Sequence, residues 1–185
     1  MVTGSAFPIL YKGAGPGTHW HSHDPRSAFG GFTAGLLPST PNAVIRHITN
    51  YSFPSAYLSF STSFAIARGY ALDGPAGIAT ASSPGYVYEI DLSALMSPPS
   101  LVDPVHTLSS PVGAFAHNHN GSDKLVAEIA GKATTFSQAH QCGGSMLSPA
   151  VNSSLRALIF AIRDAEVLIG SNVLSGAIIN RHNVF

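Results

Sequence analysis

The run from Tyr57 to Tyr70 (YLSFSTSFAIARGY) contains an abrupt change of hydrophobic periodicity. Its first part alternates apolar and polar residues, as a half-buried β-strand does, and its second part is an alanine-rich stretch typical of a helix. Three consecutive hydroxyl residues, Ser61-Thr62-Ser63, separate the two parts. The run therefore predicts a strand that delivers hydroxyl and backbone N–H groups to the start of a helix. Such a point suits a ligand that carries sugars and phosphates.

The composition is that of a globular chain with few charges. The 185 residues fit one domain, 45% are hydrophobic and the mean hydropathy is +0.21, so we expect a core of its own. Lysine plus arginine equals aspartate plus glutamate at nine each, which leaves no basic field to collect nucleic acid. Charged residues reach only 10%, which favours a secreted protein. The first residues lack a secretion signal, so export would need one outside this sequence.

Cysteine and apolar runs exclude two further classes. The single cysteine, Cys142, cannot form an intrachain disulfide or a multi-cysteine zinc site, and we expect it to be a small buried residue. No apolar run reaches the roughly 18 residues that a membrane span requires, so no span is expected. The working prediction is a monomer without a membrane span.

Local patterns predict an α+β fold with short strands and few helices. Strands are expected at residues 7–12, 57–61, 85–92, 124–130, 134–140 and 177–180, and helices at 40–48, 63–72 and 150–168. Residues 18–35, 97–104 and 113–123 are rich in glycine, proline or polar side chains and are expected to be loops.

Three segments can bring a cation, hydroxyl groups and a carboxylate to one cleft. They are Leu10-Tyr11-Lys12 on a predicted edge strand, Ser61-Thr62-Ser63, and Glu128 on a later strand. In this order the chain resembles the cholera-toxin-like mono-ADP-ribosyltransferases, whose strands carry Leu-Tyr-Arg, Ser-Thr-Ser and a catalytic glutamate. Tyr86–Ile90 resembles the family's central strand, and Phe136-Ser137-Gln138 resembles the short strand that follows the glutamate.

The resemblance implies a fold and a substrate. The fold is a split arrangement of two short antiparallel sheets with a central cleft and flanking helices. It would form a single domain over residues 1–185, of which 143–185 are a C-terminal extension. The substrate is NAD+, whose nicotinamide–ribose bond is cleaved, and the acceptor is a protein, a nucleic acid or water. No metal is expected.

Roles for individual residues follow from the same resemblance. Glu128 and Ser61 would be catalytic: Glu128 would hold the 2′-hydroxyl of the ribose, and Ser61 would fix the Glu128 carboxylate. The groups implied to bind NAD+ are Lys12 at a phosphate, the Gly13 backbone at the nicotinamide amide, Thr62 and Ser63 at the strand end, Phe64 or Tyr70 at the pyridine ring, and His19 at the adenosine. Val126 and His119 would lie on the acceptor side.

Two positions depart from the family pattern. Lys12 stands where the family has arginine, and an ammonium cannot make the planar bidentate contact of a guanidinium with phosphate. Val126 stands two residues before Glu128, where arginine-modifying members carry a second glutamate. Arginine is therefore not expected as the acceptor, and transfer to another group or to water (NAD+ glycohydrolase activity) fits better.

Two other functions remain open. If the segment around His19, His21 and His23 is extended, the three imidazoles share one face and can bind zinc, and His117 and His119 can complete the site of a metal-dependent hydrolase. Alternatively, Lys12 and Val126 mark a catalytically inactive binding domain that keeps the ADP-ribosyltransferase fold.

Overall fold

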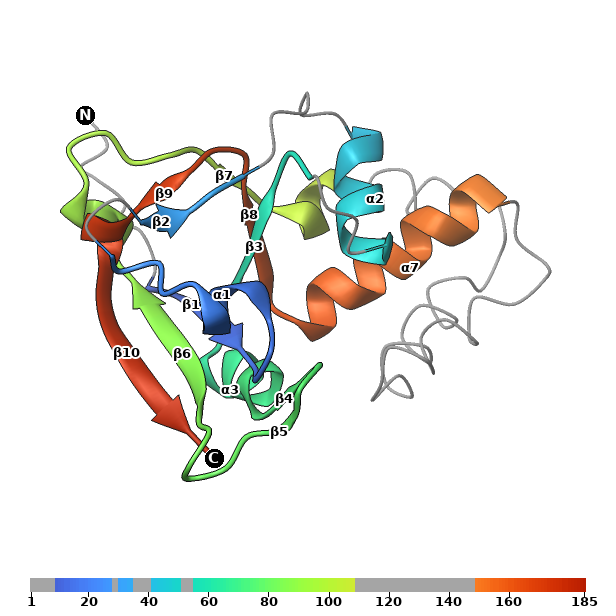
Figure 1. Cartoon of the computed structure of the whole chain (residues 1–185). Coiled ribbons are helices and arrows are strands. Elements are labelled where there is room, and N and C mark those ends of the chain that lie inside the picture. Colours follow the sequence, from blue (N-terminus) through green and yellow to red (C-terminus); the bar gives the residue numbers. More distant parts are fainter. Residues whose placement is uncertain (1–8, 28–29, 35–40, 51–54, 109–148) are drawn as a thin grey trace. The chain divides into compact units, whose positions relative to one another are not determined.

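The computed structural model describes residues 9–27, 30–34, 41–50, 55–108 and 149–185 (Figure 1). The chain divides into two compact units. The first unit comprises Met1–Ala34, Leu58–Leu101 and Ile169–Phe185, and the second comprises Gly35–Tyr57 and Val102–Leu168. The described residues form short antiparallel strands and a few helices, which confirms the α+β class. The split of two sheets around a cleft and the single ADP-ribosyltransferase-like domain stay predictions.

Four antiparallel strands of the first unit lie side by side in the order β10-β6-β1-β3 (Figure 1). Their bounds are Leu10–Ala14 for β1, Leu58–Ser61 for β3, Gly85–Ile90 for β6 and Ile178–Val184 for β10. The strand β1 therefore lies between β6 and β3, so the expectation that Lys12 stands on an edge strand is wrong. The end of the chain, through β10, completes the pairing of β6.

Shorter elements surround this sheet in the first unit. They are α1 (His19–Ser22), β2 (Gly31–Phe32), β4 (Asp73–Gly74), β5 (Gly77–Ile78), η1 (Leu92–Ala94), β9 (Val173–Leu174) and η2 (Ser175–Ala177). The strand β2 pairs with β9, and β4 pairs with β5 as a hairpin directly after helix α3 (Phe64–Leu72).

The strand β6 is covered on both faces, because successive residues of a strand point to opposite sides. On one face Val87 packs with Ala67 and Ala71 of α3. On the other face the ring of Phe32, from β2, meets the ring of Tyr88 edge-on with centroids 5.7 Å apart. Val87, Tyr88 and Phe32 are all fully buried, which explains why the segment around β6 is strongly apolar.

Helix α3 lies so close to β1 and β6 that glycine is required at both contacts. A Cβ atom on Gly13 would overlap the carbonyl oxygen of Ala67, and a Cβ atom on Gly85 would overlap that of Ala71. Both obstacles are helix backbone, which cannot rotate aside as a flexible side chain can. The two glycines therefore fix the height of α3 above the sheet.

The second unit contains two helices that pack on each other, α2 (Pro41–Asn50) and α7 (Pro149–Arg163). Its core includes Val44, Ile48, Ile159 and Phe160 from these helices and Leu108 from the helical residues 104–108. The division of the chain into units falls within two strands, β7 (Leu101–Val102) and β8 (Glu166–Ile169). Leu101 and Ile169 belong to the first unit, and the other residues of these strands belong to the second.

Several element boundaries differ from the sequence-based expectation. The predicted helix 150–168 ends at Arg163, because Ala165 adopts a left-handed backbone conformation (φ 45°) and β8 begins at Glu166. The predicted loop 18–35 contains α1 and β2, and the predicted loop 97–104 contains β7. The strand predicted at 177–180 starts one residue later and runs to Val184.

The other expected elements have two different outcomes. Helices at 40–48 and 63–72 and strands at 57–61 and 85–92 are confirmed with shifts of one or two residues. The strands predicted at 124–130 and 134–140 lie outside the described residues. Among the residues that are described, no helix is both long enough and apolar enough to cross a membrane.

The close approach of α3 yields a stability test with a matched control on the same helix. Gly13→Ala should lower the free energy of unfolding by about 1–3 kcal/mol, because the new methyl group forces α3 away from β1. Gly69→Ala adds a methyl group where nothing lies within 4 Å and should raise the stability by up to about 1 kcal/mol. Urea denaturation of both variants measures this. Equal effects of the two would contradict the proposed packing.

Candidate functional site

The predicted Lys12 and Ser-Thr-Ser segments meet at the junction of β1 and β3. Tyr11 lies directly opposite Ser61 in the antiparallel pair. Segments about fifty positions apart in the chain are thus adjacent in the fold. The chain then leaves β3 at Ser61 and enters α3 at Phe64, whereas the antiparallel β1 runs from Tyr11 to Ala14 back along β3. This end of β3 is the candidate site.

The hydroxyl triplet ends the strand and starts the helix. Ser61 is buried, and its Oγ accepts a hydrogen bond from the backbone N–H of Ser63 at 3.0 Å. Ser63 is the N-cap of α3, and its Oγ accepts from the N–H of Ile66 at 3.5 Å. Thr62, between them, is exposed. Ser61 and Ser63 therefore hold a fixed turn, and Thr62 faces solvent at its tip.

Lys12 is engaged by the neighbouring strand. Its Nζ donates a hydrogen bond to the carbonyl oxygen of Ser59 at 2.8 Å and lies 5.8 Å from the centre of the Phe60 ring. Because side chains alternate along β1, Lys12 points to the face opposite that of Tyr11 and its partner Ser61. The cation and the Ser61 side chain therefore lie on opposite faces of the sheet, and the cation contacts residues of β3 that precede Ser61.

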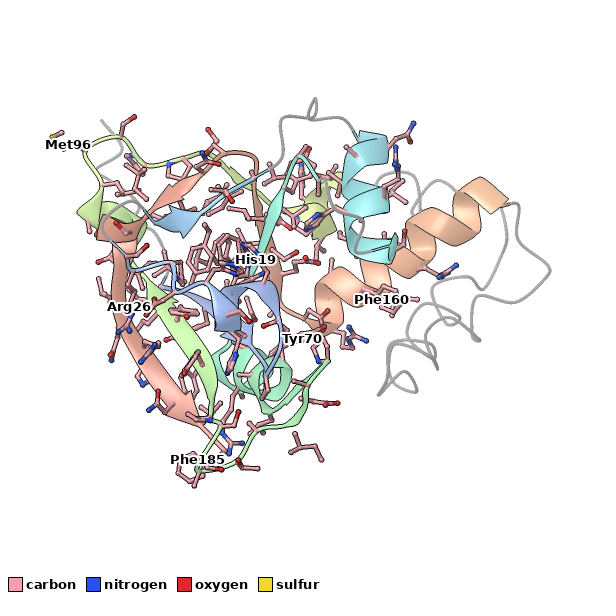
Figure 2. All side chains as sticks on the ribbon, in the orientation of Figure 1. His19, Arg26, Tyr70, Met96, Phe160 and Phe185 are labelled. Carbon is pink, nitrogen blue, oxygen red and sulfur yellow. The ribbon has the colours of Figure 1, made fainter. Side chains whose placement is uncertain are left out.

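The three other groups expected near nicotinamide lie along α3 and β1. Gly13 lies under α3, against the carbonyl of Ala67. The Phe64 ring packs edge-on against Tyr11 and His182, with centroids 5.5 and 5.1 Å apart. Tyr70 is 44% exposed (Figure 2). The packing assigns Phe64 to the helix–sheet core, so Tyr70 is the better candidate to stack on a ligand.

A carboxylate–imidazole pair, which sequence reasoning missed, lies on the Ser61 face of the sheet. Glu89 of β6 is directly opposite Tyr11, and its Oε2 lies 3.0 Å from Nε2 of His182 on β10. Both side chains are partly exposed. The two residues are 93 positions apart, and only the pairing of β10 with β6 joins them, so no local motif could indicate the pair.

The histidines of the first cluster do not form the extended array that zinc binding would need. His19 and His21 lie in helix α1, where neighbours two apart point to different sides. His19 instead stacks on His23 with ring centroids 4.6 Å apart, and His21 stacks on Tyr86 at 4.9 Å. Within the part of the chain that the structure describes, no group of three or more potential ligands could hold a metal ion.

A second cluster that the sequence did not indicate joins the segment after α1, which carries Arg26 (Figure 2), to β10. Asp24 accepts hydrogen bonds from Nη2 of Arg26 at 2.6 Å and from Nη1 of Arg181 at 3.1 Å, both at Oδ2. The guanidinium of Arg181 lies 4.2 Å from the centre of the Tyr86 ring. The hydrogen bond from Arg26 lowers the pKa of Asp24, with a smaller effect of the Arg181 charge.

The catalytic carboxylate and the acceptor-side groups expected from the motifs lie outside the described residues. These are Glu128, Val126 and His119, and the same holds for His117 and Cys142. In the second unit, β8 begins with Glu166, a partly buried residue. Asp164 of the same unit pairs with Arg163 through two hydrogen bonds of 2.7 Å.

Comparisons with protein-family models, with curated proteins and with solved structures find no match to this chain. The family assignment therefore depends on the motifs alone and stays a prediction.

The pKa of Asp24 yields a pH-dependent stability test. A carboxyl whose pKa is lower in the folded state stabilises the fold above its unfolded-state pKa, and this contribution is lost as the pH falls through the folded-state value. Asp24→Asn should therefore lower the Tm at pH 7, and the difference from the wild type should shrink below about pH 4. Thermal unfolding between pH 2 and pH 7 measures it, with Asp73→Asn, an exposed site, as control. A difference independent of pH would refute the assignment.

Proposed function

We propose that this protein cleaves the nicotinamide–ribose bond of NAD+, as a mono-ADP-ribosyltransferase or an NAD+ glycohydrolase. The observation that supports the proposal is the pairing of Tyr11 with Ser61, which joins the two first motifs of the family pattern in space. The hydroxyl turn between Ser61 and Ser63, the exposed Thr62 and the cation of Lys12 all lie within one residue of this pair or directly after it.

The chemistry requires stabilisation of a positive charge that develops on the ribose as nicotinamide leaves. A carboxylate beside the 2′-hydroxyl would stabilise that charge, and the end of β3 would hold the ribose through its hydroxyl groups. Lys12 would contact a phosphate by charge alone, and its bond to Ser59 positions the ammonium for this. Tyr70 would stack on the pyridine ring.

Glu128 is the candidate for the catalytic carboxylate, because it has the position expected from the order of motifs. Val126 stands two residues before it, where arginine-modifying members of the family carry a second glutamate. A guanidinium acceptor is therefore not expected, and transfer to another group or to water fits better.

The variant Glu128→Gln tests the assigned carboxylate. Nicotinamide release from NAD+ should fall by about 100-fold or more in this variant, because one transition-state contact is lost. Glu89→Gln is the matched control, since Glu89 pairs with His182 and is assigned no catalytic role. Chromatographic detection of nicotinamide, with and without agmatine as a guanidinium acceptor, provides the measurement.

Two outcomes would contradict these assignments. Unchanged nicotinamide release in Glu128→Gln would exclude Glu128 as the catalytic carboxylate. A wild-type protein that neither binds nor consumes NAD+ would refute the proposed function, whichever variant is compared.

The substitution at the family arginine position provides a further test. Lys12→Arg should lower the KM for NAD+ by up to about tenfold, because a guanidinium can make two parallel hydrogen bonds to phosphate. Lys12→Gln should raise the KM. NAD+ binding without turnover in the wild type, with turnover appearing only in Lys12→Arg, would instead support the inactive binding domain.

A further inference from the structure

We propose that Arg26 and Arg181 form a binding site for a phosphate group, with Asp24 as the residue that holds the two guanidinium groups together. Arg26 comes from the segment after α1 and Arg181 from β10, so the site exists only in the folded first unit. It is separate from the residues proposed to bind NAD+ and does not depend on that function.

The cluster contains two cations and one anion. Asp24 accepts from Nε and Nη2 of Arg26 and from Nη1 of Arg181. A guanidinium carries five N–H donors, so most donors of the two arginines are not used by Asp24. One positive charge is left over in a chain whose formal net charge is zero. An anion with several acceptor oxygens can satisfy both the charge and the donors.

No other carboxylate of the same strand pair neutralises the excess charge. Glu89 is bound to His182, the residue next to Arg181 on β10. Because neighbouring residues of a strand point to opposite faces, Glu89 and His182 lie on the other side of the sheet. The excess charge therefore stays on the face that carries Asp24 and Tyr86.

The guanidinium of Arg181 is held in place before any ligand arrives. It lies 4.2 Å from the centre of the Tyr86 ring, and the same ring stacks on His21 at 4.9 Å with an angle of 15°. Nε2 of His21 in turn lies 3.1 Å from the carbonyl oxygen of Pro84. Such support reduces the entropy that binding must overcome.

The two guanidinium groups are also close enough to share one ligand. Both contact the same oxygen of Asp24, at 2.6 Å from Arg26 and 3.1 Å from Arg181. The side chain of Arg26 is 41% exposed and that of Arg181 is 25% exposed, so solvent reaches both. A tetrahedral phosphate with its oxygens spread around one centre suits two converging planar donors.

The site is distinct from the position of Lys12. Along one row of the sheet, Lys12 lies opposite Tyr88, and Tyr88 lies opposite Arg181. All three point to the same face, and Tyr88 between them is fully buried, with its hydroxyl donating to the carbonyl oxygen of Trp20 at 2.9 Å. A phosphate held by Arg181 is therefore separated from one held by Lys12.

The ligand is a phosphate group, either free or at the end of a nucleotide. Isothermal titration at low ionic strength, where partly exposed charges are least screened, should be carried out with inorganic phosphate, with 5′-AMP and with adenosine. Phosphate and 5′-AMP should bind and adenosine should not. Tighter binding of 5′-AMP than of phosphate would indicate a nucleotide as the source.

The variants compare arginines of the same unit. Arg26→Gln and Arg181→Gln should each weaken phosphate binding about tenfold, through loss of charge-assisted hydrogen bonds. Arg68→Gln removes the same charge from an exposed position on α3 and should leave the affinity unchanged. If Arg181→Gln fails to fold, Arg181→Lys keeps the charge but loses the planar fork, and should also weaken binding.

Two results would overturn the proposal. One is the absence of phosphate binding by the wild-type protein, which would leave the cluster as an internal contact between the α1 segment and β10. The other is equal weakening by Arg26→Gln and Arg68→Gln, which would show a general effect of net charge. Neither result depends on whether the protein cleaves NAD+.

Discussion

The close contact of α3 with β1 and β6 determines how the candidate site is built. The helix backbone rests on Gly13 and Gly85, and its own residues at the contact are the small Ala67 and Ala71. Since the chain enters α3 two residues after β3 ends, the height of the helix also fixes the turn between them. In that turn the hydroxyl oxygens of Ser61 and Ser63 accept hydrogen bonds from backbone N–H groups, and Thr62 is exposed at the tip.

The strand β10 contributes one basic side chain to each face of the sheet. Its neighbouring residues Arg181 and His182 point in opposite directions, so each finds a different carboxylate, Asp24 or Glu89. The imidazole–carboxylate pair lies against Phe64 at the start of α3. The arginine pair lies beside Tyr86 and retains one positive charge. The strand β10 thus places one arginine and one histidine beside carboxylates on opposite faces of the sheet.

The proposed NAD+-cleaving function depends on the order of the motifs and on the end of β3. The structure adds a geometric requirement for any ligand of Lys12 and Ser61. Lys12 and Ser61 are adjacent in the sheet but point to opposite faces. Lys12 is bound to the carbonyl oxygen of Ser59, two residues before Ser61, so a ligand that contacts both groups must extend around the end of β3.

Sequence alone determined the elements whose signals are local. The change of periodicity at Ser61–Ser63 located β3 and α3, because alternation and capping depend on residues within one turn of each other. Sequence reasoning was wrong about α1 and the end of α7, where Trp20 packing on Phe32 and the left-handed Ala165 override local preference. Only the tertiary structure decided that β1 is an interior strand and that Arg181 meets Asp24, 157 positions away. Such contacts arise because strands pair in the arrangement that buries their apolar faces. The partner of a strand is therefore determined by distant segments of the chain and not by its local sequence.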